Sequence, residues 1–300
     1  MNLTRHWGRR LAGGIRLGRW LALGPAGPWV AGQATPARAG LPPDKAGYTL
    51  FHPTPRAQMR ELSTDRPDQT ESSYTVDAGH VQVEMDLVKY TYDRTAGVRA
   101  ASQALAPFNL KLGLWNNVDL QFVGEPYVRE ELDSASHPAL KAAGAGDLQT
   151  RLKLNLWGND GGKTAFAVMP FVTWPTASRD LGNGEMEGGI ILPLSISLGE
   201  RFGLGLMTEV DFRRDAVGGG YHTDFVNSIT LSCDLTDRLG GYVEFFSVVS
   251  EEPGSAWQGQ FDVGATFGLT ADVQLDAGVN IGVTDSAPDW QPFVGVTLRF

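Results

Sequence analysis

The side chains best able to bind or react are charged residues. They recur at every second position of runs in which polar and apolar residues alternate. Glu84 and Asp86 alternate with apolar residues in the run 81–87, and Lys111 does so in the run 108–114. Residues two apart in a β-strand share a face, so such runs separate a charged face from an aliphatic one. The predicted charged or polar face comprises Glu84, Asp86, Lys111, Asp119, Arg151, Lys153, Glu209, Asp211, Arg213, Glu244, Asp262, Asp276, Asn280 and Arg299.

These ionisable groups suit the interior of a membrane barrel. A Lys or Arg at the lipid mid-plane costs about 2–4 kcal/mol, whereas a wet lumen tolerates it. Lumen charges can line a conduit and set its selectivity, or they can pair with one another and block it. Strand number leaves both interpretations open, because barrels of about 8 strands are filled and those of about 16–18 are open.

Catalytic and metal-binding constellations are not predicted. A barrel hydrolase needs a Ser or Thr nucleophile with a His within reach, and His80, His137 and His222 share no obvious strand site with a serine. The single cysteine, Cys233, has the parity of neighbouring leucines, and zinc-ligand spacing is missing. We therefore predict a protein that is not an enzyme and needs no metal or cofactor.

The elements that position these residues are strands. Strict period-two alternation runs through 261–269 and 273–283 and returns in 294–300, and it predicts strands with one apolar face. About ten residues a segment fits a tilted membrane-spanning strand. A soluble barrel would bury the same apolar face in its core, so the choice depends on the rest of the chain.

Connection lengths favour the membrane. Twelve strands are predicted, and short turns alternate with long loops such as 126–146, which is typical of outer-membrane barrels. An even count places both termini in the periplasm. A phase slip at residues 87–88 predicts a β-bulge. Aromatic residues gather at predicted strand ends, as in interfacial girdles: Trp115 and Trp157 at the periplasmic side, and Trp174, Tyr221, Trp257 and Trp290 at the external side.

The region before the first strand divides in two. Residues 1–39 resemble an export signal, with a basic leader, a short apolar stretch and the small-residue sequence 37–39. Its removal would leave 19 of the 25 basic residues against 34 acidic ones, which argues against a nucleic-acid partner. Residues 40–78 are irregular and rich in Pro and Thr, and the barrel spans 79–300.

The irregular segment is a candidate plug. We hypothesise that it folds into the lumen and that Arg66 pairs with an interior acid such as Glu84 or Glu209; the alternative is a disordered periplasmic tether. The residues proposed for the plug are Thr64, Asp65, Arg66, Pro67, Thr70 and Glu71.

Three stretches carry a family resemblance. They are the block 48–84 (Tyr-Thr-Leu-Phe-His-Pro-Thr-Pro, then Leu-Ser-Thr-Asp-Arg-Pro-Asp-Gln-Thr-Glu-Ser), the run 242–246, and the Arg299-Phe300 ending. They resemble the outer-membrane barrels described as meta-pathway phenol-degradation proteins, or the transporter family. The resemblance implies a barrel that takes up aromatic or other small hydrophobic compounds. Phe300 is similar to the assembly signal of such barrels, which implies the barrel-assembly machinery as a partner.

The prediction is therefore an all-β, antiparallel up-and-down transmembrane barrel in the bacterial outer membrane. Its expected partners are outer-membrane lipid and a small-molecule solute that passes through a passive channel. The alternative from another class is a non-conducting barrel with a structural or adhesive role.

Overall fold

The structure is a computed structural model that describes residues 44–300 except 96, 135–136, 183 and 217. The predicted signal segment 1–39 thus lies outside the described residues. Within the described part, the one helix is the 3₁₀ turn η1 (Arg56–Gln58). No helix there is long and apolar enough to cross a membrane.

Strands dominate the chain. Their bounds are β1 (Val81–Thr95), β2 (Val98–Leu105), β3 (Phe108–Trp115), β4 (Val118–Gly124), β5 (Tyr127–Ser134), β6 (His137–Gly144), β7 (Leu148–Trp157), β8 (Thr164–Trp174), β9 (Glu187–Ser197), β10 (Phe202–Arg214), β11 (Tyr221–Asp234), β12 (Leu239–Ser250), β13 (Gln258–Thr270), β14 (Val273–Gly282) and β15 (Trp290–Arg299).

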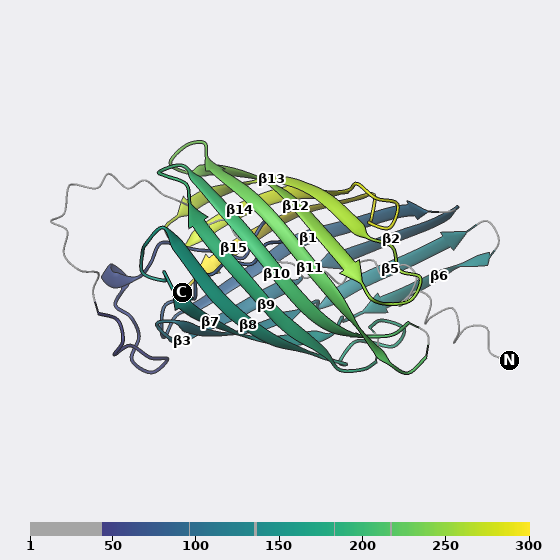
Figure 1. Ribbon diagram of the computed structural model, residues 1–300, viewed down its shortest axis with the longest axis horizontal. Coiled ribbons are helices and arrows are strands. Elements are labelled where there is room, and N and C mark those ends of the chain that lie inside the picture. The colour runs from purple at the N-terminus through teal and green to yellow at the C-terminus, as the bar shows by residue number, and fades with distance from the viewer. Residues whose placement is uncertain (1–43, 96, 135–136, 183, 217) are drawn as a thin grey trace.

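The strands form one closed antiparallel barrel (Figure 1). Neighbours in space are neighbours in sequence around most of the wall, and β15 pairs with β1 to close it. Three pairs of consecutive strands (β2 with β3, β4 with β5, and β6 with β7) are each one strand interrupted by a short break, so the fifteen segments make twelve barrel strands. The predicted twelve-stranded up-and-down barrel is confirmed.

The interruptions follow from local chemistry. Ala106 has a φ of 52° and precedes Pro107, so the chain turns between β2 and β3; a proline also lies between β4 and β5. On β1, the register against β15 shifts between Asp86 and Val88, which confirms the predicted bulge. Because of these breaks, β1 pairs with β3 through its first half and with β2 through its second.

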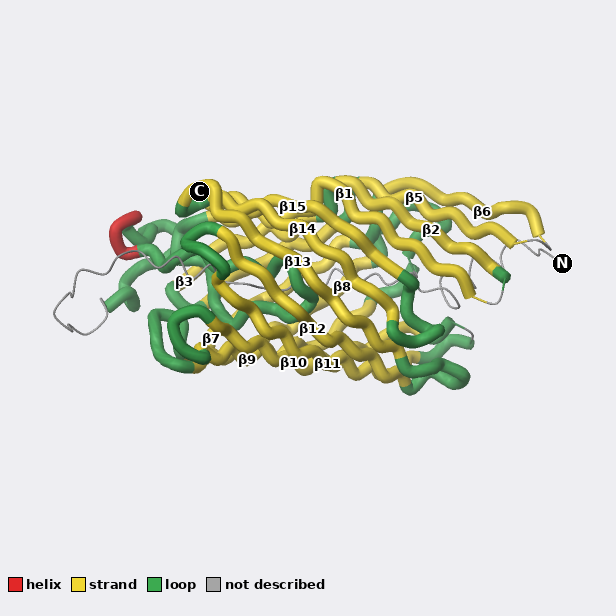
Figure 2. The backbone as a smooth tube through the Cα atoms, turned by 90° about the horizontal axis from the view of Figure 1, so that it is seen from above, coloured by secondary structure: helices red, strands yellow, loops and turns green. Residues whose placement is uncertain are grey.

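Beyond the breaks, a sheet extension projects from the barrel. Figure 2 shows β2, β5 and β6 reaching past the rest of the wall. The predicted loop 126–146 is therefore wrong, because it contains β5 and β6. The edge near the break after β6 is covered by the loop after β8: Ser178 N donates to Ala145 O at 2.9 Å, and Leu181 packs on Ala104 and Val128. Covering an edge in this way blocks pairing with other chains.

Side-chain burial gives the orientation of the wall. On β13, Phe261 and Val263 are 44% and 39% exposed, while Asp262 between them is completely buried. The same alternation places Glu244 inside and Phe245 outside on β12. Aliphatic residues thus face outward and charged residues inward, as predicted for a barrel in lipid. The six aromatic residues assigned to the two girdles are all exposed near strand ends.

Candidate functional site

The N-terminal segment enters the barrel and crosses its lumen. From Leu62 to Ala78 all residues except Ser63 and Tyr74 are buried, although the segment contains no helix or strand. We call residues 62–78 the plug. Its polar side chains and backbone groups need partners when buried, and the inward charges of the wall supply them.

Arg66 is held by two carboxylates from the seam where the barrel closes. Its Nη2 lies 2.6 Å from Asp276 Oδ1 and 2.5 Å from Asp86 Oδ1, and Nε donates to Asp276 Oδ2 at 3.2 Å. The guanidinium also stacks over Phe293, and a side chain at Gly295 would overlap it. Arg66 thus pairs with interior acids, as hypothesised, but these are Asp86 of β1 and Asp276 of β14 and not the two examples Glu84 and Glu209.

Asp65 binds the opposite charge on the neighbouring wall. Lys153 Nζ lies 2.7 Å and 3.0 Å from its two carboxylate oxygens, and Lys111 contacts both Asp65 and Glu84. The Asp65 backbone N–H donates to Glu84 Oε2 at 2.9 Å. A buried charge is tolerated when it is paired and hydrogen-bonded in this way, so this cluster fixes one side of the plug to β1, β3 and β7.

The tip of the plug, which we define as residues 69–71, reaches the opposite side of the lumen. Thr70 Oγ1 donates to Glu244 Oε1 at 2.5 Å, and the Gln69 backbone N–H donates to Glu244 Oε2 at 2.7 Å. Gln69 Nε2 bonds Asp262 Oδ2 at 2.7 Å, while Glu71 pairs with Arg151 at 2.5 Å. The plug thus bridges the β7 wall and the β11–β13 wall.

A second set of ion pairs fastens the base of the segment to the turns. Asp160, in the β7–β8 turn, lies 2.8 Å from Lys45 Nζ and 2.9 Å from Arg60 Nη1. Burial favours its neutral form, but hydrogen bonds from Lys45 and Asn116 and the charge of Arg60 outweigh burial, so the pKa of Asp160 lies below its usual value.

Asp272, in the β13–β14 turn, is held in the same way. Arg299 Nε lies 2.8 Å and Arg56 Nη1 3.0 Å from its carboxylate. Burial again raises its pKa, but hydrogen bonding and charge from Arg299 lower it further, so the net shift is downward. Arg299 also donates to Arg60 O at 2.8 Å, so it holds the chain immediately before the plug.

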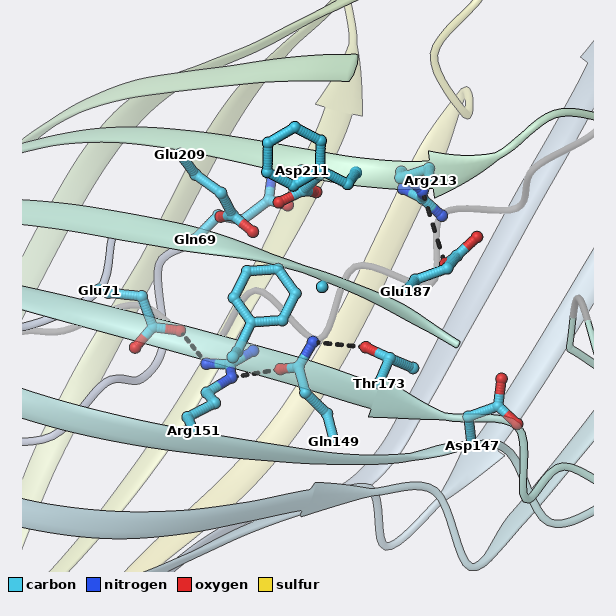
Figure 3. A pocket seen from close by; sticks show the side chains of 13 residues that line it. Gln69, Glu71, Asp147, Gln149, Arg151, Thr173, Glu187, Glu209, Asp211 and Arg213 are labelled. Atoms are coloured by element: carbon cyan, nitrogen blue, oxygen red, sulfur yellow. Dashed lines mark hydrogen bonds and ion pairs between the residues drawn. The ribbon is translucent and has the colours of Figure 1, made fainter. Parts of the chain in front are cut away.

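Above the plug, a small outer pocket of about 60 Å³ is lined by four strands, three of which (β7, β9 and β10) contribute charged groups. In Figure 3, Glu71 bonds Arg151, Arg151 bonds Gln149, and Gln149 bonds Thr173 across the pocket wall. The lining residues are Gln69, Glu71, Asp147, Gln149, Arg151, Phe171, Thr173, Glu187, Gly188, Glu209, Asp211, Phe212 and Arg213. The plug forms its floor, so a solute entering here meets charge first.

An apolar cluster also faces the interior, and alternation did not reveal it. Its members come from β8–β12 and are Met169, Phe171, Ile191, Met207, Val226, Phe246 and Val248. Glu71 N contacts Met207 Sδ at 3.3 Å, so the cluster adjoins the plug tip. A signal existed on β8, where every residue from 165 to 172 is apolar and neither face can be polar. The lumen therefore has an apolar surface as well as a charged one.

The fourteen residues predicted to face the lumen fall into three groups. Nine contact the plug: Glu84, Asp86, Lys111, Asp119, Arg151, Lys153, Glu244, Asp262 and Asp276. Glu209, Asp211 and Arg213 join Arg151 at the outer pocket. Arg299 bonds Arg60 at the barrel end where the N-terminal segment enters, and Asn280 is buried on β14. Gln69 and Gln260, which bond each other at 2.7 Å, were missed because amides carry no charge signal.

One group among the described residues has spacing suited to a metal. Ligand atoms of Asp215, His222 and Glu252 lie within 4.8 Å of one another. They already bond each other and the backbone: His222 Nδ1 lies 2.9 Å from Asp215 Oδ1, and Glu252 accepts from Ala216 N at 2.5 Å. We interpret the group as a link between the β10–β11 and β12–β13 loops and assign no metal to it.

Fold and interior together define an outer-membrane β-barrel with a plugged, charged lumen. The chain belongs to the family described as "Putative MetA-pathway of phenol degradation", whose model matches residues 64–300. The predicted resemblance is thus confirmed. No curated protein matches the chain significantly.

Among solved structures, the COG4313 outer membrane channel from Pseudomonas putida F1 is similar. It aligns with a TM-score of 0.58 and 15% identity over 74% of this chain and 95% of its own. The NanC porin (TM-score 0.49, 7% identity, 73% of this chain and 98% of its own) and the CymD monoaromatic hydrocarbon channel (0.42, 9%, 73% and 87%) are more distant. At these identities the similarity shows the fold alone.

Proposed function

We propose that the protein is a passive outer-membrane channel for small solutes, and that the plug sets the width and selectivity of its path. The observation that carries the proposal is the polar interior: charges of both signs line a closed barrel whose outer face is aliphatic. Such a lining suits the passage of water and small solutes. The relative from Pseudomonas putida is itself a channel, which agrees with this role.

The proposed class of solute is based on the apolar part of the lumen. The seven-residue apolar cluster lies beside the outer pocket, with Phe171 in both. A small solute with an apolar body, such as an aromatic compound, fits that combination, and the family description refers to phenol degradation. Translocation needs no covalent chemistry, so we assign no enzymatic activity.

Orientation and assembly complete the proposal. The segment 44–80 lies at the same barrel end as the short turns and the C-terminus (Figure 1), and short turns are periplasmic in this class; this supports our proposal that the segment before β1 and the C-terminus face the periplasm. Phe300, exposed beside β1 through its bond to Val81 O at 2.8 Å, is the proposed signal for the barrel-assembly machinery.

Single-channel recording tests the channel function. The full chain and a variant that lacks residues 40–77 would be reconstituted in planar bilayers, with folding checked by heat-modifiable gel mobility. We expect small, brief openings from the full chain and larger, steadier ones from the variant, because the variant lacks the bridge across the lumen. Silence from both folded proteins would contradict the proposal.

That silent outcome would favour the second candidate, a non-conducting structural or adhesive barrel. Two observations support this alternative: the ion-paired plug crosses the lumen, and the β2–β5–β6 extension projects beyond the barrel (Figure 2). Binding of cells that display the barrel to a surface, with and without β5 and β6, would measure adhesion.

A further inference from the structure

A larger cavity lies on the other side of the plug, toward the periplasmic end. We call it the inner cavity; its volume is about 590 Å³, within the roughly 300–1,000 Å³ typical of small-molecule sites. The plug side contributes Met59, Leu62, Tyr74 and Val76. These four residues form an apolar stretch with one aromatic ring, which suits the hydrocarbon body of a ligand; polar and charged residues such as Arg60 and Asp77 line the same side.

The cavity exists because the facing wall carries small side chains. The inward positions in the periplasmic halves of β9–β11 are small residues: Ser195, Ser197, Gly203, Gly205 and Ser232. Gly205 also lets the plug approach, because an added Cβ would lie 3.2 Å from Thr70 Cγ2. Wall and plug therefore touch at Thr70 and leave space between them below it.

Asp68 lines this cavity with a carboxylate that lacks a protein partner. Its side chain is completely buried, and neither carboxylate oxygen has a hydrogen bond within the described part of the chain. The hydroxyl of Thr230, another lining residue, is the nearby donor that acts on Asp68, but it donates its proton to Glu244 Oε1 at 2.9 Å. A buried carboxylate without a donor is costly, and such a group calls for a ligand that supplies one.

The ionisable groups around Asp68 are mainly acidic. Glu244 and Asp262 both act on Asp68, and Lys89 acts in turn on Asp262. The cations of the plug and its base bind other acids: Arg66 binds Asp86 and Asp276, and Lys45 and Arg60 bind Asp160. A cationic ligand would restore the balance.

We propose that the inner cavity binds small amphipathic amines, with the ammonium group at Asp68 and the apolar body against Leu62, Tyr74 and Val76. The ammonium donates hydrogen bonds and neutralises the surplus charge, and the body fills the apolar side. As the assignment of a solute class, the inference rests on the proposed channel function; as a binding site, it is measurable without conduction.

Calorimetric titration of the full, folded barrel in detergent tests the proposal with three probes of equal size. Benzylamine carries a cation, benzyl alcohol a neutral donor and benzoate an anion. We expect benzylamine to bind at least about tenfold more tightly than benzyl alcohol, a difference of about 1.4 kcal/mol, and benzoate not to bind. Equal binding of benzylamine and benzoate would overturn the proposal.

Two variants and a control locate the site. Asp68→Asn should abolish the preference for benzylamine, and Ser232→Leu, which fills the cavity from β11, should weaken both benzylamine and benzyl alcohol. Asp237→Asn is the control, because Asp237 is an exposed carboxylate of the β11–β12 turn and does not line the cavity; its effect should stay within about twofold. Unchanged benzylamine affinity in both Asp68→Asn and Ser232→Leu would refute the site.

Conductance separates this inference from the channel function. If benzylamine binds as described but folded barrels stay silent, the site stands and the channel proposal fails. If the barrels conduct but Asp68→Asn leaves the probe preference intact, the channel stands and the assignment of Asp68 fails.

Discussion

Arg66 illustrates how a single residue holds the plug. Its guanidinium is buried between Asp86 and Asp276, which come from β1 and β14 on either side of the closing strand. Desolvation of three charges is expensive, and close hydrogen-bonded geometry offsets it. Removing one member leaves the others buried without compensation, so the arrangement is far more sensitive to truncation than a surface pair.

Arg66→Gln should therefore lower the free energy of unfolding by about 3–5 kcal/mol and increase the open-channel current, because the plug loses its attachment to the seam. Urea unfolding in lipid vesicles measures the first effect. The matched control is Arg56→Gln: Arg56 pairs with Asp272 but its side chain is 68% exposed, so the loss should be at most about 1 kcal/mol. Equal losses in the two variants would contradict this account of the plug.

At the scale of residues, the sequence predicted which side chains point into the barrel, but it did not predict which of them form ion pairs with the plug. Alternation placed Asp86, Lys111 and Asp262 on the inward face because the strand period is two, and all three are buried there. The partner of Arg66 could not be chosen, since Glu84, Asp86 and Glu209 all share that face. The choice depends on the path of the plug, and an irregular segment has no periodicity from which to derive a path.

At the scale of elements, the plug is held by contacts inside the lumen and by ion pairs at its base, and the strength of the basal ion pairs depends on pH. Its base depends on Asp160 and Asp272, whose pKa values both lie below the usual 3.8. Because the pKa of each carboxyl is lowered in the folded protein, its ion pairs are fully formed above about pH 4. They weaken as the pH falls through the lowered pKa values.

We expect channel noise to rise when the periplasmic chamber is brought below about pH 4, because the ion pairs of Asp160 and Asp272 weaken there. Asp160→Asn should produce part of this noise already at pH 7, because the amide cannot pair with Lys45 and Arg60. Asp237→Asn, an exposed residue of the β11–β12 turn, is the control and should behave like the parent protein. Noise that increases with pH would have the wrong sign.

The interrupted strands mark the limit of pattern-based prediction for elements. Membrane-spanning strands such as β13 were predicted because lipid demands an apolar outer face. The extension β2, β5 and β6 projects beyond the rest of the wall (Figure 1), and its sequences, such as Tyr127–Ser134, show no sustained apolar alternation. Where neither side of a sheet faces lipid, the period-two signal fades, and these strands resembled a polar loop.

At the scale of the whole molecule, stability depends on the aliphatic outer face being matched to lipid. Val263 and Val283 are both outward and exposed, but Val263 lies in the middle of β13, whereas Val283 follows the end of β14. The cost of a charge on the lipid face depends on its depth, so these positions form a matched pair.

Val263→Arg should destabilise the barrel in vesicles by about 2–4 kcal/mol, and Val283→Arg by about 0–1 kcal/mol. Urea titrations in lipid measure both. In detergent micelles, which adapt to the protein, the difference should shrink. Equal costs for the two variants in lipid would show that Val263 is not in the hydrocarbon layer.

The contacts of Arg66 also bear on how the ring is assembled. Arg66 and Asp276 are 210 positions apart in the chain, and the plug touches walls formed by nearly every part of the sequence between them. Contacts of such long range make folding slow, because much chain entropy is lost before they form. When β15 pairs with β1 around the N-terminal segment, the ring closes and its bore is occupied in the same step, so an empty ring need not form as an intermediate.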